Sequence, residues 1–567
     1  MIGIYIHIPF CRSRCSYCDF NTYSGMDHLI DAYVEALCRE IEIFTSPQPV
    51  ARDLLLHSAP LSTPNVLQSQ SRLQLKPTPL APRQPTNLSQ YQPQRQPLPS
   101  PQSQPQPQPH PSPQSQPQPQ PFPSLQSQPQ PQPHPSPQPQ PQPHVINDDC
   151  IPMIDTVFIG GGTPSYIESR HIRRILNTLS IYTESHGLSQ SLSSSNGELL
   201  HCAKDHSLNS ANKQLLNSAN GQLLHGAKDQ TISSANEQLL HDPNGQIINS
   251  ANEQLLHSAN GQPPYPDMRR VECTLEANPG TLSEEKLAEY YAMGINRLSF
   301  GLQSIHEDQL RLLGRIHSFK DFKDNIMAAR RIGFENISAD VIFGIPGQSA
   351  ESWEQTLATV VESGVKHISC YSLSLEKGTR LHSMIENKTI VSPDEELDRY
   401  MYHYALEFLK KSGFVHYEIS NFAQPGYECR HNMKYWTCGE YLGFGAGASS
   451  HYKSVRYTND ASITDYINKI NKNGSAVNAS QSEILDKAEK MKEHIILRLR
   501  LCEGVHTGEF EARFNLGFFA MYGNSVDKLA QEDLLSVNKV SPHCDHSIIR
   551  LTKKGLDFAN LVFMEFI

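Results

Sequence analysis

Isoleucine occupies every second position at the start of the chain, at Ile2, Ile4, Ile6 and Ile8. This alternation predicts a strand over residues 2–9. The next apolar residues recur at the spacing of one helical face, and they are Leu29, Ile30, Tyr33, Val34, Leu37, Ile41 and Phe44. Further strand-like runs, each followed by a helix candidate, span residues 155–160, 271–276, 297–302, 338–343 and 367–375. Strands that alternate with helices predict an α/β fold with a parallel sheet and crossover helices.

Two long segments interrupt this pattern. Residues 47–150 are rich in proline and glutamine, which favour extended chain and offer little apolar area for a core, so we expect a disordered insertion. Residues 185–268 repeat a short motif at multiples of eight residues, from Asn196 to Asn252, and a period of eight fits no common structural repeat. We therefore expect a second insertion, and we divide the remaining chain into barrel segments 1–46, 151–184 and 269–480 and a C-terminal domain 481–567.

Composition narrows the classes of function. The 567 residues include 48 Lys and Arg against 58 Asp and Glu, so the net charge of -10 does not attract nucleic acid. Twelve cysteines without regular pairing, and no secretory leader, favour a reducing compartment. No apolar run is long enough to span a membrane. We expect a cytoplasmic protein with neither a transmembrane segment nor a nucleic-acid partner.

Three cysteines follow the first predicted strand, at Cys11, Cys15 and Cys18. A structural zinc site needs four ligands and no fourth candidate lies nearby, whereas a four-iron cluster held by three cysteines keeps one iron open to an outside ligand. Free cysteines are often buried in cores, but Arg12, Ser13 and Arg14 between these cysteines are typical of a loop. The spacing therefore predicts an iron–sulfur cluster.

Other polar or glycine-rich stretches fall where predicted strands end, as reactive groups do in parallel barrels. They are Gly160–Ser165, Glu276–Pro279, Gln303 and Asp340. The glycines leave room for close main-chain approach and Thr163 adds a hydroxyl, although an ordinary strand-to-helix turn would explain a glycine run alone.

The spacing CxxxCxxC resembles the signature of the radical SAM superfamily, in which S-adenosylmethionine (SAM) chelates the fourth iron. In type and order, the later polar residues resemble those of the oxygen-independent coproporphyrinogen III oxidases and their relatives. The resemblance implies a partial parallel (β/α)6 barrel with a small C-terminal helical, winged-helix-like domain. It also implies a [4Fe-4S] cluster on Cys11, Cys15 and Cys18, and SAM contacts from Tyr5, Tyr17, Gly161, Gly162, Thr163, Glu276, Gln303, Arg315 and Asp340.

Two features of the chain resemble those of the HemW-type heme chaperones, which form one branch of this family. Cys18 is followed by Asp19 and Phe20, where the oxidases carry a further cysteine, and the chain contains the motif HNMKYW. The resemblance implies heme as a third cofactor, with His431, Tyr435 and Trp436 as the heme residues. By itself the motif also fits a buried structural histidine, and Cys429 and Cys438 beside it leave a separate metal site open.

We expect a heme chaperone that hands heme to an acceptor hemoprotein, with a homodimer as the candidate assembly, and we assign no catalytic residue. The alternative is an oxidase that decarboxylates coproporphyrinogen III. A third class is a redox-active binding module whose Pro/Gln segment recruits a partner.

Overall fold

The computed structural model describes residues 1–45, 153–179, 271–541 and 544–567. The two predicted insertions, residues 47–150 and 185–268, lie outside the described residues, so their character and the domain boundaries drawn around them stay predictions.

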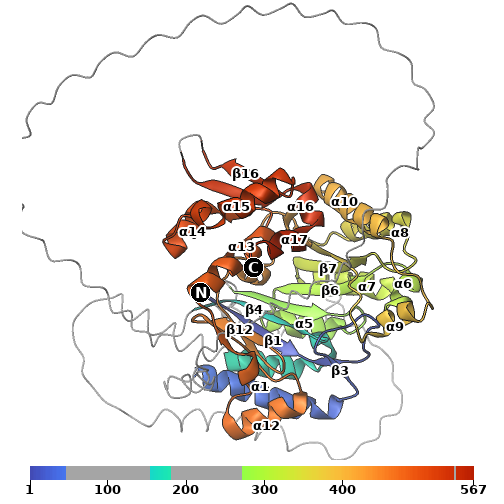
Figure 1. Ribbon diagram of the computed structural model, residues 1–567. Coiled ribbons are helices and arrows are strands. Elements are labelled where there is room, and N and C mark those ends of the chain that lie inside the picture. The colour runs from blue at the N-terminus through green and yellow to red at the C-terminus, as the bar shows by residue number, and fades with distance from the viewer. Residues whose placement is uncertain (46–152, 180–270, 542–543) are drawn as a thin grey trace, which may run out of the picture. The chain divides into compact units, whose positions relative to one another are not determined.

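The six predicted strands are present, parallel and adjacent in chain order (Figure 1). They are β1 (Ile2–Ile8), β4 (Ile154–Gly161), β5 (Glu272–Ala277), β6 (Arg297–Gln303), β7 (Asn336–Phe343) and β8 (His367–Ser372). β8 ends at Ser372 rather than at residue 375, because the chain turns there toward the helix that Thr379 caps. The sheet runs β14-β13-β12-β11-β1-β4-β5-β6-β7-β8-β10-β9 and does not close on itself within the described residues, which confirms a partial barrel of the predicted class.

A seventh parallel strand, β11 (Tyr441–Phe444), pairs with β1 in the register Gly3 to Tyr441 through Ile6 to Phe444. This strand was not predicted, because four residues beside a glycine-rich stretch look like a loop. Short antiparallel strands extend both edges of the sheet: β9 (Val415–Glu418), β10 (Asn421–Ala423), β12 (Ser449–Tyr452), β13 (Val455–Thr458) and β14 (Glu483–Ile484). The strands β2 (Phe10–Cys11) and β3 (Tyr23–Ser24) form a separate pair next to the cysteines.

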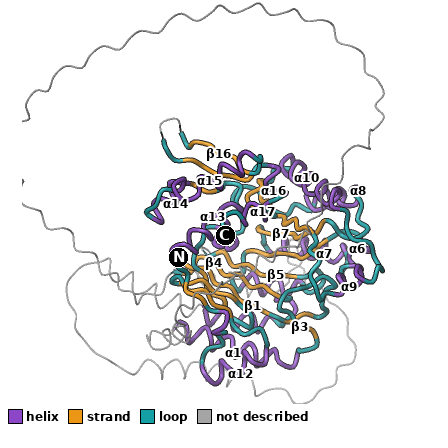
Figure 2. Tube along the Cα trace, in the orientation of Figure 1, coloured by secondary structure: helices purple, strands orange, loops and turns teal. Residues whose placement is uncertain are grey.

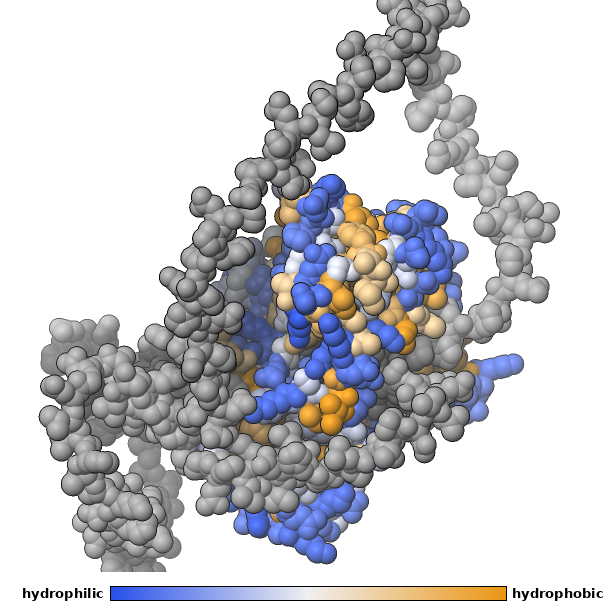
Figure 3. Space-filling model, turned by 60° about the vertical axis from the view of Figure 1, so that its left-hand side comes forward, coloured by the Kyte–Doolittle hydropathy of each residue, from blue (hydrophilic) through white to orange (hydrophobic). Residues whose placement is uncertain are grey.

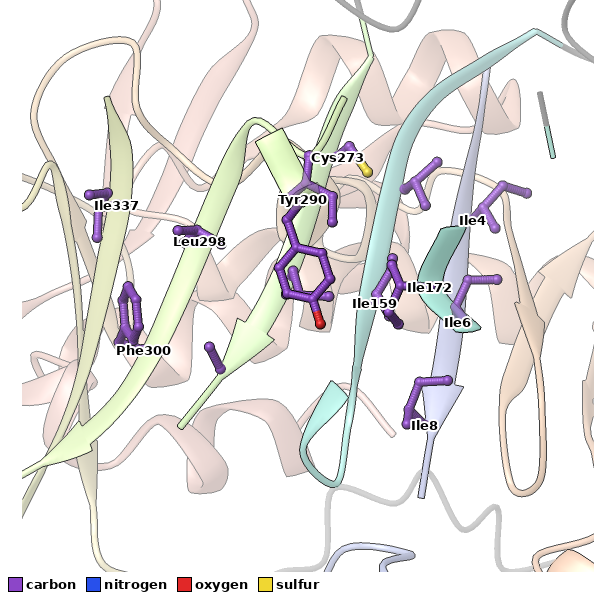
Figure 4. Close-up of a cluster of buried hydrophobic side chains, with 14 of the residues drawn as sticks. Ile4, Ile6, Ile8, Ile159, Ile172, Cys273, Tyr290, Leu298, Phe300 and Ile337 are labelled. Atoms are coloured by element: carbon purple, nitrogen blue, oxygen red, sulfur yellow. The ribbon is translucent and has the colours of Figure 1, made fainter. Parts of the chain in front are cut away.

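The strands carry an apolar face toward the helices. Ile4, Ile6 and Ile8 lie on one side of β1, together with Ile159 of β4 and Leu298 of β6 (Figure 4). Removing one such side chain from water stabilises the fold by roughly 1.5–3 kcal/mol. Since successive side chains of a strand point to opposite faces, the residues between them face the barrel interior.

Helices cover the apolar face of the sheet (Figure 2). The predicted first helix is α1 (Ile30–Thr45), and it buries Tyr33, Val34, Leu37, Ile41 and Phe44 as its spacing implies. Ser318 and Asp321 form a capping box that fixes the start of α7 (Phe319–Ile332). This part also contains helical residues 169–179 and the helices α5 (Glu284–Ala292), α6 (Glu307–Leu312), α8 (Ala350–Glu362), α9 (Arg380–Glu386), α10 (Glu395–Lys411), α11 (Arg430–Trp436) and α12 (Ile463–Asn473).

The C-terminal region is mainly helical and adds a three-stranded antiparallel sheet of order β15-β17-β16. It contains α13 (Lys487–Arg500), β15 (Val505–His506), α14 (Thr507–Phe514), α15 (Phe518–Gln531), β16 (Leu535–Lys539), β17 (Ser547–Leu551), α16 (Lys553–Asp557) and α17 (Ala559–Met564). Phe510, Phe514 and Phe518 form part of its core. Hydrophilic and hydrophobic residues are interspersed on the face shown in Figure 3. None of the described helices is long and apolar enough to cross a bilayer.

Candidate cluster and cofactor site

The three cysteines lie in the segment that follows β1, at the carboxyl ends of the parallel strands, and Cys11 ends the short strand β2. The Cys11 sulfur is 3.4 Å from the Thr163 hydroxyl, and the Cys18 sulfur is 3.4 Å from the Thr22 hydroxyl. Thr163 accepts a hydrogen bond from the Asn278 side chain at 2.9 Å, so its own proton is available to Cys11. Burial raises the pKa of the Cys11 thiol, while the Thr163 hydroxyl lowers it.

Arg315 points inward to this loop. Its guanidinium donates to the Cys15 sulfur at 3.4 Å, to the Gly301 carbonyl at 2.6 Å and to the Asn278 side chain. A positive charge and two hydroxyls beside three sulfurs favour the thiolate form that iron requires.

The donor set therefore fits the predicted cluster. No three His, Cys, Asp or Glu side chains of the described residues converge on a single metal ion. A four-iron cluster does not need such convergence, because each cysteine binds a different iron atom.

The glycine run packs against the end of β1. A side chain at Gly161 would meet the His7 ring at 2.5 Å, and one at Gly162 would meet the main chain of Ile8 and Phe10 at 2.9 Å. The Gly162 amide donates to Ile8 and the Thr163 amide donates to Phe10, at 2.8 and 2.9 Å. These contacts hold the segment that carries Cys11, so the run has a structural role beside the SAM contact predicted for it.

A cavity of about 200 Å³ occupies the barrel interior. Tyr5, Glu276 and Asp340 of the predicted SAM set line it, and so do His431 and Tyr435 of the predicted heme set. The other lining residues are Phe158, Arg297, Ser299, His367, Ser369, Tyr371 and Asn432. The structure thus brings residues of both predicted sets to one polar chamber.

The remaining predicted SAM residues lie outside the lining of this cavity. Gln303 follows an irregularity in β6, has φ 69° and is buried. Its amide and the Arg315 guanidinium both lie 3.0 Å from the position of a side chain at Gly301, so this glycine makes room for them. Tyr17 packs against a small apolar cluster of Leu313, Ile342 and Ile345.

Two acids give the cavity its electrostatic character. Burial and the neighbouring Asp340 raise the pKa of Glu276 to about 7, although Glu276 accepts the Gly161 amide at 3.0 Å. Burial also raises the pKa of Asp340, against hydrogen bonds from Ser369 and Ser299. Perturbed carboxyls in a cleft are typical of functional sites.

The HNMKYW motif forms α11, at the opposite end of the strands from the cysteines. His431 is 1% exposed, and its two ring nitrogens lie 2.9 Å from the Thr156 hydroxyl and 2.8 Å from the Tyr435 hydroxyl. Burial lowers the pKa of His431 to about 3, so the ring is neutral. Glu272, at the start of β5, accepts the main-chain amides of Arg430 and His431 and so caps this short helix.

Trp436 lies at the other end of α11, outside the cavity lining. The Arg500 guanidinium stacks over its ring at 4.4 Å, and the buried indole nitrogen has no hydrogen-bond partner among the described residues.

Several interior residues were not foreseen from the sequence: Phe158, Arg297, Ser299, His367, Ser369 and Tyr371 line the cavity, and Thr156 and Glu272 support it. Most of them occupy strand positions between buried apolar residues. The alternation of each strand was the signal that could have found them.

The sheet, the cysteine loop and the cavity define a radical SAM protein. The family model described as "Radical SAM superfamily" matches residues 221–360, and the model described as "HemN C-terminal domain" matches residues 485–558. A solved structure of coproporphyrinogen III oxidase (HemN) from Escherichia coli shares this fold, with a TM-score of 0.58 and 17% identity over 100% of this chain and 89% of that chain.

Curated relatives give a closer assignment. Heme chaperone HemW of Lactococcus lactis is 34% identical over 296 residues, which cover 52% of this chain and 75% of the relative. Heme chaperone HemW of Bacillus subtilis is 34% identical over 52% of this chain and 76% of its own length. A mitochondrial "Radical S-adenosyl methionine domain-containing protein 1" of Bos taurus is 33% identical over 50% of this chain and 65% of its own length. The chain belongs to the HemW family of radical SAM proteins, and membership implies a [4Fe-4S] cluster and SAM.

Proposed function

We propose that this protein is a heme chaperone that binds a [4Fe-4S] cluster, SAM and heme and delivers heme to acceptor hemoproteins. One observation carries the proposal: Glu276 and Asp340 line the same polar cavity as His431 and Tyr435 of the HNMKYW helix, in a chain of the HemW family. A cytoplasmic location and a homodimeric state belong to the same proposal.

In this proposal Cys11, Cys15 and Cys18 hold the cluster, which supplies one-electron chemistry when bound. The Thr163 and Thr22 hydroxyls and the Arg315 guanidinium stabilise the negative charge of the sulfurs.

SAM contacts come from three groups of residues. The interior wall supplies Tyr5, Glu276 and Asp340, the turn after β4 supplies Gly161, Gly162 and Thr163, and the cluster end supplies Tyr17, Gln303 and Arg315. Glu276 and Asp340 can hold protons or accept the hydroxyl and ammonium groups of a small zwitterion, because burial raises both of their pKa values.

Heme contacts come from α11, through His431, Tyr435 and Trp436. The interior cavity of about 200 Å³ is smaller than the roughly 300–1,000 Å³ clefts that hold ligands of drug size. Heme therefore does not enter the barrel in this conformation. For His431 to bind iron, α11 must move and the ring nitrogen must leave the Tyr435 hydroxyl.

The test uses Tyr435→Phe, which keeps the aromatic ring and removes the hydrogen bond that competes with iron for His431. If His431 is an axial ligand, heme affinity rises about fivefold, since a hydrogen bond contributes about 1 kcal/mol net. His431→Ala should weaken heme binding and leave the absorbance of the cluster unchanged.

Heme titration of the full-length chain, followed by the Soret band, measures both effects. Tyr427→Phe is the matched control, because Tyr427 lies outside the cavity lining and outside α11. Equal heme affinity in His431→Ala and the wild type would remove His431 from the proposed heme site.

A further inference from the structure

A second pocket lies where the β12–β13 hairpin approaches the C-terminal region. It has a volume of about 450 Å³ and is lined by Ser454, Lys487, Lys490, Arg513, Phe514 and Asn515. Ser454 belongs to the turn between β12 and β13, the lysines to the first turns of α13, and the remaining residues to the end of α14. This volume, unlike that of the interior cavity, falls within the range of ligand clefts.

The pocket is cationic. Lys487, Lys490 and Arg513 line it, no carboxylate is among the described residues that line it, and none of the three cations forms an ion pair with a described residue. By contrast, nearby arginines of the same region are paired, such as Arg456 with Glu493 and Arg498 with Glu509. Three unpaired cations gathered at one concave site, in a chain of net charge -10, favour a ligand that brings its own negative charge.

The pocket also adjoins the proposed heme helix. The Arg513 guanidinium donates to the Cys438 carbonyl at 3.4 Å, and Cys438 lies two residues after the end of α11. Arg513 also lies over the ring of Phe514, 5.7 Å from its centre. An apolar wall therefore meets the cationic groups.

A neutral imidazole lies near this site, outside the residues that line it. His451 lies on β12, three residues before Ser454, and its side chain is only partly buried. Burial and the positive charges of Arg456, Arg513 and Lys490 lower its pKa to about 4, although Glu440 opposes this shift. No hydrogen bond joins its ring to a described residue, so its lone pair is available, whereas both nitrogens of His431 are engaged.

We propose that this pocket is the first docking site of heme, with Lys487, Lys490 and Arg513 binding the propionate carboxylates and His451 facing the iron. The proposal rests on the proposed chaperone function and names the surface that receives heme before α11 opens. Carboxylates suit this set because ammonium and guanidinium groups form charge-assisted hydrogen bonds with them. A neutral imidazole is a common axial ligand of heme iron.

The experiment compares ferric heme with heme dimethyl ester, in which both propionates are blocked, by titration of the full-length chain. The pocket variant is Lys490→Gln with Arg513→Gln. The control is Lys410→Gln with Lys472→Gln, two exposed lysines of α10 and α12 that give the same change of charge. We expect the wild type and the control to prefer heme over its ester, and the pocket variant to bind heme about tenfold more weakly and to lose the preference. His451→Ala should shift the Soret band of the docked heme.

Three results would overturn the docking site. The first is a pocket variant that binds heme like the control, which leaves the chaperone proposal intact. The second is a wild type that binds heme and its dimethyl ester equally well and releases heme when inorganic pyrophosphate is added. The pocket would then be a phosphate site. The third is a wild type that binds neither heme nor its ester, and this result alone also overturns the proposed function.

Discussion

Gly162→Ala tests the claim that the glycine run holds the cluster loop. The added Cβ would lie 2.9 Å from the carbonyl oxygens of Ile8 and Phe10, whereas ordinary contacts of such an atom begin at 3.4 Å. These oxygens belong to the main chain of β1 and β2 and cannot rotate away as a side chain can. The turn and the strand end must therefore separate by about half an ångström.

Overpacking of this kind costs about 1–3 kcal/mol of stability. It also displaces Thr163, whose amide donates to Phe10 and whose hydroxyl lies beside the Cys11 sulfur. We expect a lower Tm by circular dichroism and less iron and sulfide per chain after anaerobic reconstitution.

Gly523→Ala is the control for this experiment. Gly523 lies inside α15, and its added Cβ would meet only the Phe519 Cβ at 3.8 Å, so alanine there should stabilise the helix by about 0.5–1 kcal/mol. A Gly162→Ala protein with the stability and iron content of the wild type would refute the packing argument.

Three further predictions follow from the same geometry. The stability of Glu276→Gln relative to the wild type should rise between about pH 5 and about pH 8. Between the ordinary carboxyl pKa of 4.5 and about 7, the folded wild type keeps a proton on Glu276 that the unfolded chain releases. The free energy of unfolding of the wild type therefore falls over this range, whereas that of the neutral variant does not. Denaturant unfolding at several pH values measures this, and a pH-independent difference would contradict it. Arg315→Lys should weaken SAM binding at least about tenfold, because an ammonium group cannot reach Cys15, Gly301 and Asn278 together. Calorimetric titration of the reconstituted protein measures the SAM affinity, and an unchanged affinity would count against Arg315 as a SAM contact. Glu272→Gln should lower the free energy of unfolding by about 1–2 kcal/mol, because it weakens the hydrogen bonds that cap α11, and equal unfolding midpoints would show that the cap contributes nothing.

The parallel core could be predicted from sequence because each strand has buried apolar residues at every second position and a helix after it. β11 could not be predicted in this way. It pairs with β1 from more than 400 residues away, and its four residues gain their strand character from that pairing rather than from their own pattern.

The site residues that belong to sequence motifs could be predicted, whereas the surroundings that tertiary packing gives to each side chain could not. Cys11, Glu276 and Asp340 lie at strand ends or inside the barrel, as their positions implied. The two hydrogen bonds that enclose His431 could not be foreseen, because Thr156 and Tyr435 reach it from a distant strand and from one helical turn away. Burial of this kind depends on where α11 packs, which a six-residue motif does not reveal.

The central claim is that the chain binds and transfers heme rather than oxidising coproporphyrinogen III. Its most direct test reconstitutes the cluster anaerobically and divides the protein between two assays. One assay adds coproporphyrinogen III, SAM and a reductant and analyses the porphyrins, and the other loads heme and follows its transfer to an apo-hemoprotein. We expect heme transfer without decarboxylated porphyrin. SAM-dependent formation of protoporphyrinogen, with no heme transfer, would contradict it and identify a coproporphyrinogen oxidase.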